Sequence, residues 1–148
     1  MNLRGVLSVR RLVRVAACCV LAGAGGCAPA PAPVACSDLG GTPMLEYQLF
    51  FGRGIPGRAD VTDREWADFA EHVVTPNLPN GFTALDADGQ WMNPATHRII
   101  RERTKVIIVA APNSEATRSA ITAIQDAYRT RFHQQAVGAT VHLTCGAF

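Results

Sequence analysis

The chain has 148 residues, of which 48% are hydrophobic and 18% charged, and its formal net charge is +2. This length suits one globular domain, and the composition argues against wholesale disorder, a coiled coil and a protein with several membrane spans. The first 26 residues hold four arginines and no acid, so residues 27–148 carry 10 basic and 12 acidic side chains, a net charge of −2. A nucleic-acid-binding domain needs a basic excess, so we expect no nucleic-acid partner.

Residues 1–26 have the features of a signal peptide. Basic residues from Arg4 to Arg14 precede an apolar stretch of twelve residues, Val15–Gly26. A helix needs about 20 residues to span a bilayer, whereas an apolar stretch of this length is typical of a signal peptide. The glycines at its end disfavour a buried core helix. We therefore expect the protein to be exported.

Cys27 is the predicted lipidation site. Small residues precede it in Ala24-Gly25-Gly26-Cys27, which resembles a bacterial lipobox, although Ala24 replaces the usual larger apolar residue. This pattern predicts a membrane-anchored lipoprotein of the cell envelope, whose partner is the membrane itself. The alternative is ordinary signal cleavage near Ala22-Gly23-Ala24, which would give a secreted or periplasmic soluble protein.

The segment after Cys27 is predicted to be a spacer. Residues 28–35 read APAPAPVA. Alternating prolines favour an extended polyproline II chain, with about 3.1 Å per residue. Residues 27–43 are therefore predicted to be an Ala/Pro tether and lead-in to a single domain at residues 44–148.

Two cysteines, Cys36 and Cys145, remain near the ends of the predicted mature domain. In an oxidising compartment such an even pair predicts a disulfide. Two unpaired thiols are the alternative. The sequence has no C-x-x-C motif, so it does not indicate thioredoxin-like redox chemistry or a zinc knuckle.

The first half of the domain predicts a strand followed by a helix. Apolar side chains alternate along Met44–Phe51, as in a half-buried strand. The residues Thr62-Asp63-Arg64-Glu65 form a capping box that starts a helix. Pro76 is predicted to end this helix at Thr75, because a proline disfavours helical geometry in the residue before it.

Two strands are predicted next. The first covers Phe82–Ala87, and Asp88-Gly89 is a hairpin-type turn signal that leads to Gln90–Met92. After a turn at Asn93-Pro94, His97–Ala110 is predicted to be the longest strand. Its last part is apolar on both faces.

The last two elements are predicted to be a helix and a strand. Asn113 or Ser114 is the expected N-cap of the helix. Ala139–Cys145 alternates as a strand with Val141, Leu143 and Cys145 pointing inward.

The order βαββαβ predicts an α+β domain of the ferredoxin-like type, with two helices on one face of a four-stranded antiparallel sheet. The first and fourth strands are then antiparallel neighbours. This arrangement brings Cys36 and Cys145 to the same edge.

Several short segments, in this order and spacing, resemble those of a family of short exported bacterial proteins. They are Tyr47–Arg53, Glu65-Trp66, Val74–Pro76, Gly81–Thr83, Asp86–Trp91, Arg101–Lys105 and Ala127–Phe132. The chain resembles domain-of-unknown-function family three-five-seven-four over roughly residues 44–148. The resemblance implies export and a single small domain. The family has no assigned activity, so it implies no catalytic residue.

The glycine-rich segment Gly52–Gly57 matches the pattern G-x-G-x-x-G, but it does not predict a dinucleotide site. Such a site needs the third glycine in the first turn of a helix within a parallel βαβ unit. Here Pro56 interrupts the segment and the predicted sheet is antiparallel. A loop is the better interpretation, and its two arginines, Arg53 and Arg58, are candidates to attract an anion to the helix start.

A basic strand face is the strongest candidate for a ligand site. Arg101, Arg103 and Lys105 alternate along one strand. We expect them on the open sheet face near Glu46 or Gln48, where they would bind an anionic ligand. The candidate residues of this site are Tyr47, Arg53, Arg101 and Lys105. The alternative is a solvated, ion-paired strand that discourages edge aggregation.

Other chemistry is not indicated. The four histidines do not lie at the spacing of a metal site, and no serine lies in a nucleophile elbow, so we expect no metal, no cofactor and no catalytic residue. Both tryptophans, Trp66 and Trp91, are expected in the core.

The favoured function is a non-enzymatic, membrane-tethered binding or assembly module of the cell envelope. Its open sheet face would carry Met44, Phe50 and Val106 or Ile108, and would pair with a second copy or with another envelope protein. The alternative is a small enzyme or ligand carrier that uses the same face for an anionic ligand.

Overall fold

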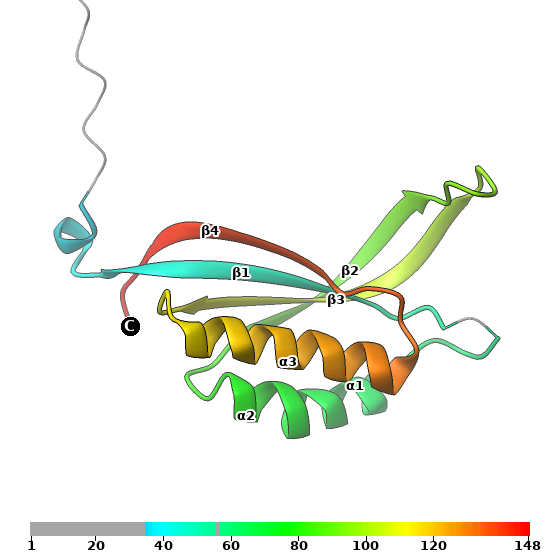
Figure 1. Cartoon of the computed structure of the whole chain (residues 1–148), viewed down its shortest axis with the longest axis horizontal. Helices are drawn as coiled ribbons and strands as arrows, with labels where there is room; N and C mark the ends of the chain where they lie inside the picture. The colour runs from blue at the N-terminus through cyan, green and yellow to red at the C-terminus, as the bar shows by residue number, and fades with distance from the viewer. Residues whose placement is uncertain (1–34, 56) are drawn as a thin grey trace, which may run out of the picture. The chain divides into compact units, whose positions relative to one another are not determined.

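The computed structural model describes residues 35–55 and 57–148 (Figure 1). The predicted signal peptide, Cys27 and most of the predicted tether lie outside the described residues. The elements are η1 (Cys36–Leu39), β1 (Thr42–Gly52), α1 (Asp63–Phe69), η2 (Ala70–Val74), α2 (Thr75–Asn77), β2 (Thr83–Met92), β3 (Ile99–Ala111), α3 (Glu115–Phe132) and β4 (Gly138–Gly146).

The four strands form one sheet in the order β2-β3-β1-β4, and every neighbouring pair is antiparallel. The continuous helix α1–η2–α2 and the helix α3 both lie on one side of this sheet, and the outer parts of β2 and β3 extend beyond them (Figure 1). The prediction of an α+β fold with one four-stranded antiparallel sheet and two helices is therefore confirmed.

A disulfide closes the domain at the edge of β1 and β4. Cys36 in η1 is bonded to Cys145 near the end of β4, with their Cα atoms 5.3 Å apart and 109 positions apart in the sequence. The pairing predicted from the sequence is confirmed. It arises because β1 and β4 are antiparallel neighbours, so that the chain before β1 meets the end of β4.

The predicted capping box starts the first helix. The Thr62 hydroxyl accepts the backbone N–H of Glu65 at 3.2 Å, and the Glu65 carboxylate accepts the backbone N–H of Thr62 at 2.8 Å. This hydrogen bond from Thr62, and a second one from the Arg58 guanidinium, lower the pKa of Glu65 to about 2. The carboxylate thus stays ionised at the positive end of the helix.

The prediction that Pro76 ends this helix at Thr75 is wrong, because the helix continues to Asn77. A π turn at Ala70–Val74 precedes the proline, and there the Ala70 carbonyl accepts both the backbone N–H and the hydroxyl of Thr75. The wider turn relieves the clash that a proline makes with the carbonyl four residues before it in a regular α-helix.

The predicted turn at Asp88-Gly89 is also wrong. Both residues lie inside β2, where Asp88 pairs with Arg103 and Gly89 with Glu102. The chain reverses later, where the Asn93 side chain accepts the N–H groups of the second and third residues that follow it. Pairing of β2 with Ile99–Ile108 of β3 thus outweighs the local turn preference of Asp-Gly.

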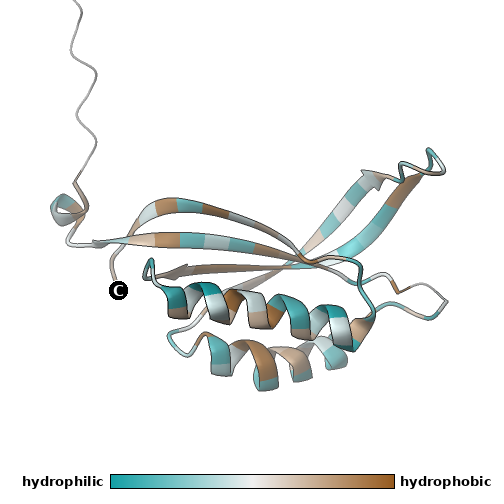
Figure 2. Ribbon diagram, in the orientation of Figure 1, coloured by the Kyte–Doolittle hydropathy of each residue, from teal (hydrophilic) through white to brown (hydrophobic). Residues whose placement is uncertain are grey.

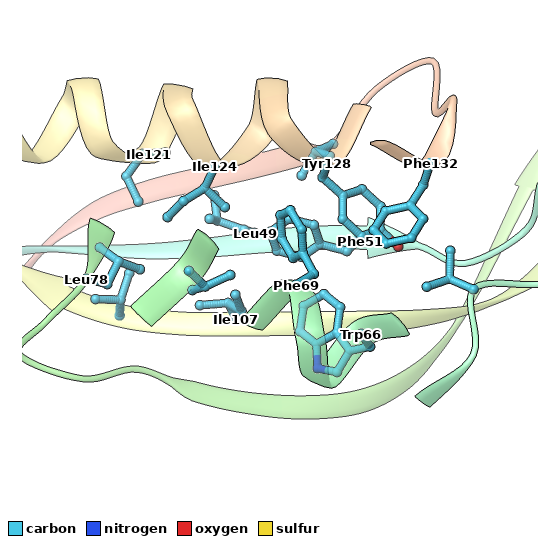
Figure 3. Close-up of a cluster of buried hydrophobic side chains, with 14 of the residues drawn as sticks. Leu49, Phe51, Trp66, Phe69, Leu78, Ile107, Ile121, Ile124, Tyr128 and Phe132 are labelled. Carbon is cyan, nitrogen blue, oxygen red and sulfur yellow. The ribbon is translucent and has the colours of Figure 1, made fainter. Parts of the chain in front are cut away.

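The core lies between the sheet and the helices, and aromatic rings fill its centre (Figure 3). The ring cluster consists of Phe51, Trp66, Phe69, Tyr128 and Phe132, with centroids of neighbouring rings 4.7–6.2 Å apart. Leu49 and Ile107 extend it along the sheet. In Figure 2 the part of β3 beside the helices is hydrophobic, whereas the outer arm carries more hydrophilic residues.

The edge strand β4 differs from its predicted environment. Val141 pairs with Tyr47 and Leu143 with Leu45, so both lie on the helix side of the sheet as expected. They are nevertheless 53% and 75% exposed. The predicted inward face is therefore right, but neither side chain is buried, because the helices do not cover this edge strand.

Candidate functional site

The basic residues of β3 lie on the opposite face from the one expected. Lys105 pairs with Phe51, a fully buried core residue, and directly paired residues share a face of the sheet. Arg101 and Arg103 follow Lys105 at a spacing of two and lie on this same helix side. Glu46 and Gln48 lie on the other side, so the predicted basic site beside them on the open face is wrong.

Arg53 is a structural residue at the start of the loop after β1. Its side chain is only 2% exposed. Its Nε donates to the Val61 carbonyl at 2.6 Å, and its Nη1 donates to the Asp63 carboxylate at 2.8 Å. The guanidinium therefore ties both ends of the loop to the first turn of α1, and it is not open to an external anion.

Lys105 is also neutralised within the molecule. Its Nζ lies 2.6 Å from the Asp86 carboxylate and 3.8 Å from that of Asp63. The hydrogen bond from Lys105 lowers the pKa of Asp86 below its usual value. Arg103 approaches the same Asp63 carboxylate at 3.9 Å. This ion-pair network matches the alternative drawn from the sequence, a strand whose charges are paired.

The four candidate anion-binding residues are thus not brought together. Arg53 and Lys105 meet through shared carboxylates, but Tyr47 is buried in the core opposite Val109. Arg101 lies in the outer arm of β3, beyond the last residue that pairs with β1. The alternation of basic residues was a correct signal that they share a face, but it does not say which one.

The open face of the sheet carries few charges. Its residues, read from the strand register, are Thr42, Met44, Glu46, Gln48, Phe50 and Gly52 in β1; Thr83, Leu85, Ala87, Gly89 and Trp91 in β2; Ile100, Glu102, Thr104, Val106, Ile108 and Ala110 in β3; and Gly138, Thr140, His142, Thr144 and Gly146 in β4. No lysine or arginine occurs among these paired residues.

An uncharged row crosses the middle of this face. Leu85, Val106 and Phe50 lie side by side on β2, β3 and β1, followed by Gly138 on β4. Leu85 is 47% exposed and Phe50 is 37% exposed. Charged residues are depleted from the centre of protein interfaces, so this apolar row has the composition of an interface.

A cleft of about 780 Å³ lies beside the outer arm of β3. The lining residues are Gly54, Ile55, Asp60, Asp88, Trp91, Asn93, Ile100, Arg101, Glu102, Arg103, His133, Gln134, Gln135 and Ala136. A second cleft of about 430 Å³ adjoins it on the open face, and the two share Asp88, Trp91, Glu102, Gln134 and Ala136. Volumes of this size are typical of small-molecule sites.

Glu102 lies where the two clefts meet, and no motif in the sequence marks it as a site residue. A Cβ atom placed on Gly52 would lie 2.7 Å from the Glu102 carboxylate, and one on Gly54 would lie 3.3 Å from it. The carboxylate therefore packs closely against the backbone at these two glycines, where an added side chain would force it to shift. The first two glycines of the G-x-G-x-x-G segment, Gly52 and Gly54, thus allow a close approach of Glu102, a role that their local spacing alone does not reveal.

Trp91 is the second residue of the clefts that the sequence misplaced. It is 44% exposed, so the expectation that it is a core residue is wrong. It lies on the hairpin arm, beyond the reach of the helices, whereas Trp66 is buried in the ring cluster as expected.

Tyr128 holds the backbone against which Glu102 packs. Its hydroxyl donates a hydrogen bond to the Gly52 carbonyl at 3.0 Å. Burial raises the pKa of Tyr128, so the hydroxyl keeps the proton that this hydrogen bond requires. The aromatic core thereby fixes the glycine backbone on which the Glu102 carboxylate rests.

The described residues contain no group of three or more histidine, cysteine, aspartate or glutamate side chains arranged to hold a metal ion. Within the same residues, no helix has the length and apolar composition needed to cross a lipid bilayer.

Solved structures with a similar fold include a phage SAM lyase in its apo state and in complex with S-methyl-5'-thioadenosine. Each is 12% identical to this chain with a TM-score of 0.53, and each comparison covers 71% of this chain. The comparisons cover 90% of the chain in the complex and 86% of the apo chain. At this identity the likeness concerns the fold alone.

No curated protein matches the sequence. The family described as protein of unknown function (DUF3574) matches residues 46–148, which include all the paired residues of β3 and the linings of both clefts. The family resemblance noted in the sequence is thus confirmed, and the chain belongs to the DUF3574 family of proteins of unknown function.

Proposed function

We propose that the protein is an exported lipoprotein of the cell envelope, anchored through Cys27, whose domain is a non-enzymatic binding module. The disulfide between Cys36 and Cys145 supports export, because disulfides persist in oxidising compartments outside the cytoplasm. The basic, then apolar, then small-residue order of residues 1–26 supports a signal peptide, and the cysteine at position 27 supports lipidation.

The fold of the binding module is proposed to be ferredoxin-like. The chain order βαββαβ, the strand order β2-β3-β1-β4 and the position of both helices on one side of the sheet support this assignment (Figure 1). Such an arrangement leaves the other side of the sheet free for association.

The proposed binding partner is a second copy of the chain, which would pack on the open face. The observation that carries this proposal is the uncharged row Leu85–Val106–Phe50 on the side of the sheet away from the helices, where Leu85 and Phe50 are exposed and Val106, between them, is 8% exposed. Two identical apolar rows pack together without bringing like charges into contact. The helix side of the same strands, by contrast, carries Arg101, Arg103 and Lys105.

We expect the full chain carrying Cys27→Ser, which lacks the acylation site, to be a dimer by light scattering at high concentration. Leu85→Glu places two like charges in the proposed interface. Such juxtaposition costs several kcal/mol, so the dimer dissociation constant should rise by ~100-fold or more. The variant should be a monomer at concentrations where the parent chain is a dimer.

Leu143→Glu is the matched control, because Leu143 is an exposed leucine on the other side of the sheet. This variant should remain a dimer. A parent chain that is monomeric at every concentration, or a Leu143→Glu variant that dissociates as readily as Leu85→Glu, would contradict the proposed interface.

A ligand carrier is the second candidate function, and the cleft of about 780 Å³ favours it. Among the candidate anion-binding residues, only Arg101 lines this cleft. Arg53 and Lys105 are engaged by Asp63 and Asp86. A carrier for an anionic ligand would therefore depend on Arg101.

A further inference from the structure

The larger cleft forms where β1 separates from β3. The last backbone hydrogen bond on this side joins the Arg53 N–H to the Arg103 carbonyl at 2.9 Å. Beyond it, the segment Ile100–Glu102 has no strand on this edge and faces residues 54–55 and 134–136 across the cleft. The cleft therefore opens at a strand edge and does not lie over the uncharged row.

Glu102 is the acidic centre of this cleft. Its side chain is partly buried, and no hydrogen bond or ion pair engages its carboxylate among the described residues. The neighbouring acids Asp63 and Asp86, in contrast, are each within 4 Å of two or more basic groups. A partly desolvated carboxylate without a partner attracts a cation more strongly than a fully solvated one does.

Trp91 gives the cleft an aromatic wall next to this carboxylate. Gly89 pairs with Glu102 and Trp91 pairs with Ile100, so Trp91 and Glu102 are diagonal neighbours on the same face of the hairpin. Gly89 has no side chain to separate them. The face of an exposed indole attracts cations through its quadrupole, most strongly among the aromatic side chains.

The remaining charges of the cleft favour a cation as well. Its lining has three acids, Asp60, Asp88 and Glu102, against two arginines, and Asp88 pairs directly with Arg103 on the helix side of the hairpin. Of the two arginines in the lining, Arg103 lies 3.9 Å from the Asp63 carboxylate, and both belong to the helix side of the strand, opposite Glu102.

We propose that this cleft binds a small organic cation with a flat apolar body, whose positive group pairs with Glu102 and contacts the face of Trp91. The cleft lies within one chain, so this inference does not depend on the proposed dimer. The volume of about 780 Å³ admits a ligand of the size of a nucleoside or an aromatic amine.

The probe for this site is benzyltrimethylammonium, a flat aromatic body with a permanent positive charge. We expect saturable binding to the full Cys27→Ser chain by calorimetry, with shifts of the Trp91 indole signal in NMR spectra. Phenylacetate, which carries a negative charge on a similar body, should bind at least ~10-fold more weakly, because the unpaired carboxylate repels it.

Three variants test how Glu102, Trp91 and Arg101 contribute to binding of the probe. Glu102→Gln and Trp91→Leu should each weaken binding of the probe by ~10-fold or more, since each removes one of the two proposed contacts. Arg101→Gln removes a positive charge from the cleft wall and should strengthen binding of the probe. The control Glu71→Gln changes an exposed acid of η2 that does not line the cleft, and it should bind as the parent chain does.

These titrations distinguish a cation site from an anion site in the cleft. Weaker binding of the cation in Glu102→Gln with tighter binding in Arg101→Gln supports the cation site. No saturable binding of the probe, unchanged binding in Glu102→Gln, or stronger binding of phenylacetate that is lost in Arg101→Gln would overturn it. Repeating the titration on Leu85→Glu separates this result from dimerisation, since the monomer should bind equally well.

Discussion

Phe51→Ala is expected to lower the free energy of unfolding by about 3–5 kcal/mol in urea denaturation. Phe51 is fully buried, and its ring centroid lies 4.9 Å from that of Tyr128 and 5.3 Å from that of Trp66. The substitution leaves a cavity at the centre of the ring cluster, and the rings from both helices then lose their common contact on the sheet (Figure 3).

Phe50→Ala is the matched control, because the neighbouring phenylalanine lies on the opposite, open face and is 37% exposed. It should cost about 1–2 kcal/mol, less than Phe51→Ala, when measured on the Leu85→Glu background, where association no longer contributes. Should Phe51→Ala abolish folding, Phe51→Leu gives the smaller loss that a partly filled cavity predicts. Equal losses for positions 50 and 51 would contradict the assignment of the two faces.

Removing the disulfide is expected to have the next largest effect. The double variant Cys36→Ser/Cys145→Ser should lose about 2–5 kcal/mol of stability, because the bond closes a loop of 109 positions and restricts the unfolded chain. Denaturation of the parent chain with and without reductant checks the cause. The reductant should lower the stability of the parent chain to that of the variant and leave the variant unchanged.

A double variant as stable as the oxidised parent would contradict this prediction. It would mean that the contacts of β1 with β4 alone hold the two ends of the domain together, and that the bond adds nothing beyond them.

The elements that the sequence predicted correctly carry local signals. The alternation of β1, the capping box at Thr62 and the N-cap at Ser114 depend on residues within a few positions of one another. The pairing of Cys36 with Cys145 followed from strand order, which the succession of elements already implied. These features can therefore be predicted from the sequence without knowledge of the tertiary contacts.

The errors arise where distant residues outweigh a local preference. Pro76 does not end its helix because a π turn accommodates the ring, and Asp88-Gly89 does not turn because β3 is long enough to pair with both residues. In the same way, period-two alternation groups Arg101 with Lys105 but leaves the choice of face to the register with Phe51.

The candidate cation site was not predictable from spacing. Glu102 is one acid among alternating charges in the sequence, and its environment depends on glycines from β1, the following loop and β2. Only the folded hairpin arm shows that its carboxylate has no basic partner among the described residues. The G-x-G-x-x-G segment was visible as a motif, but its contact with Glu102 exists only once β1 pairs with β3.

The most direct measurement is the intact mass of the protein extracted from its native membrane, before and after reduction. We expect a chain that starts at an acylated Cys27 and gains the mass of two hydrogens when the bond between Cys36 and Cys145 is reduced. A full-length chain that starts at Met1, carries no acyl group and has the same mass before and after reduction would contradict it.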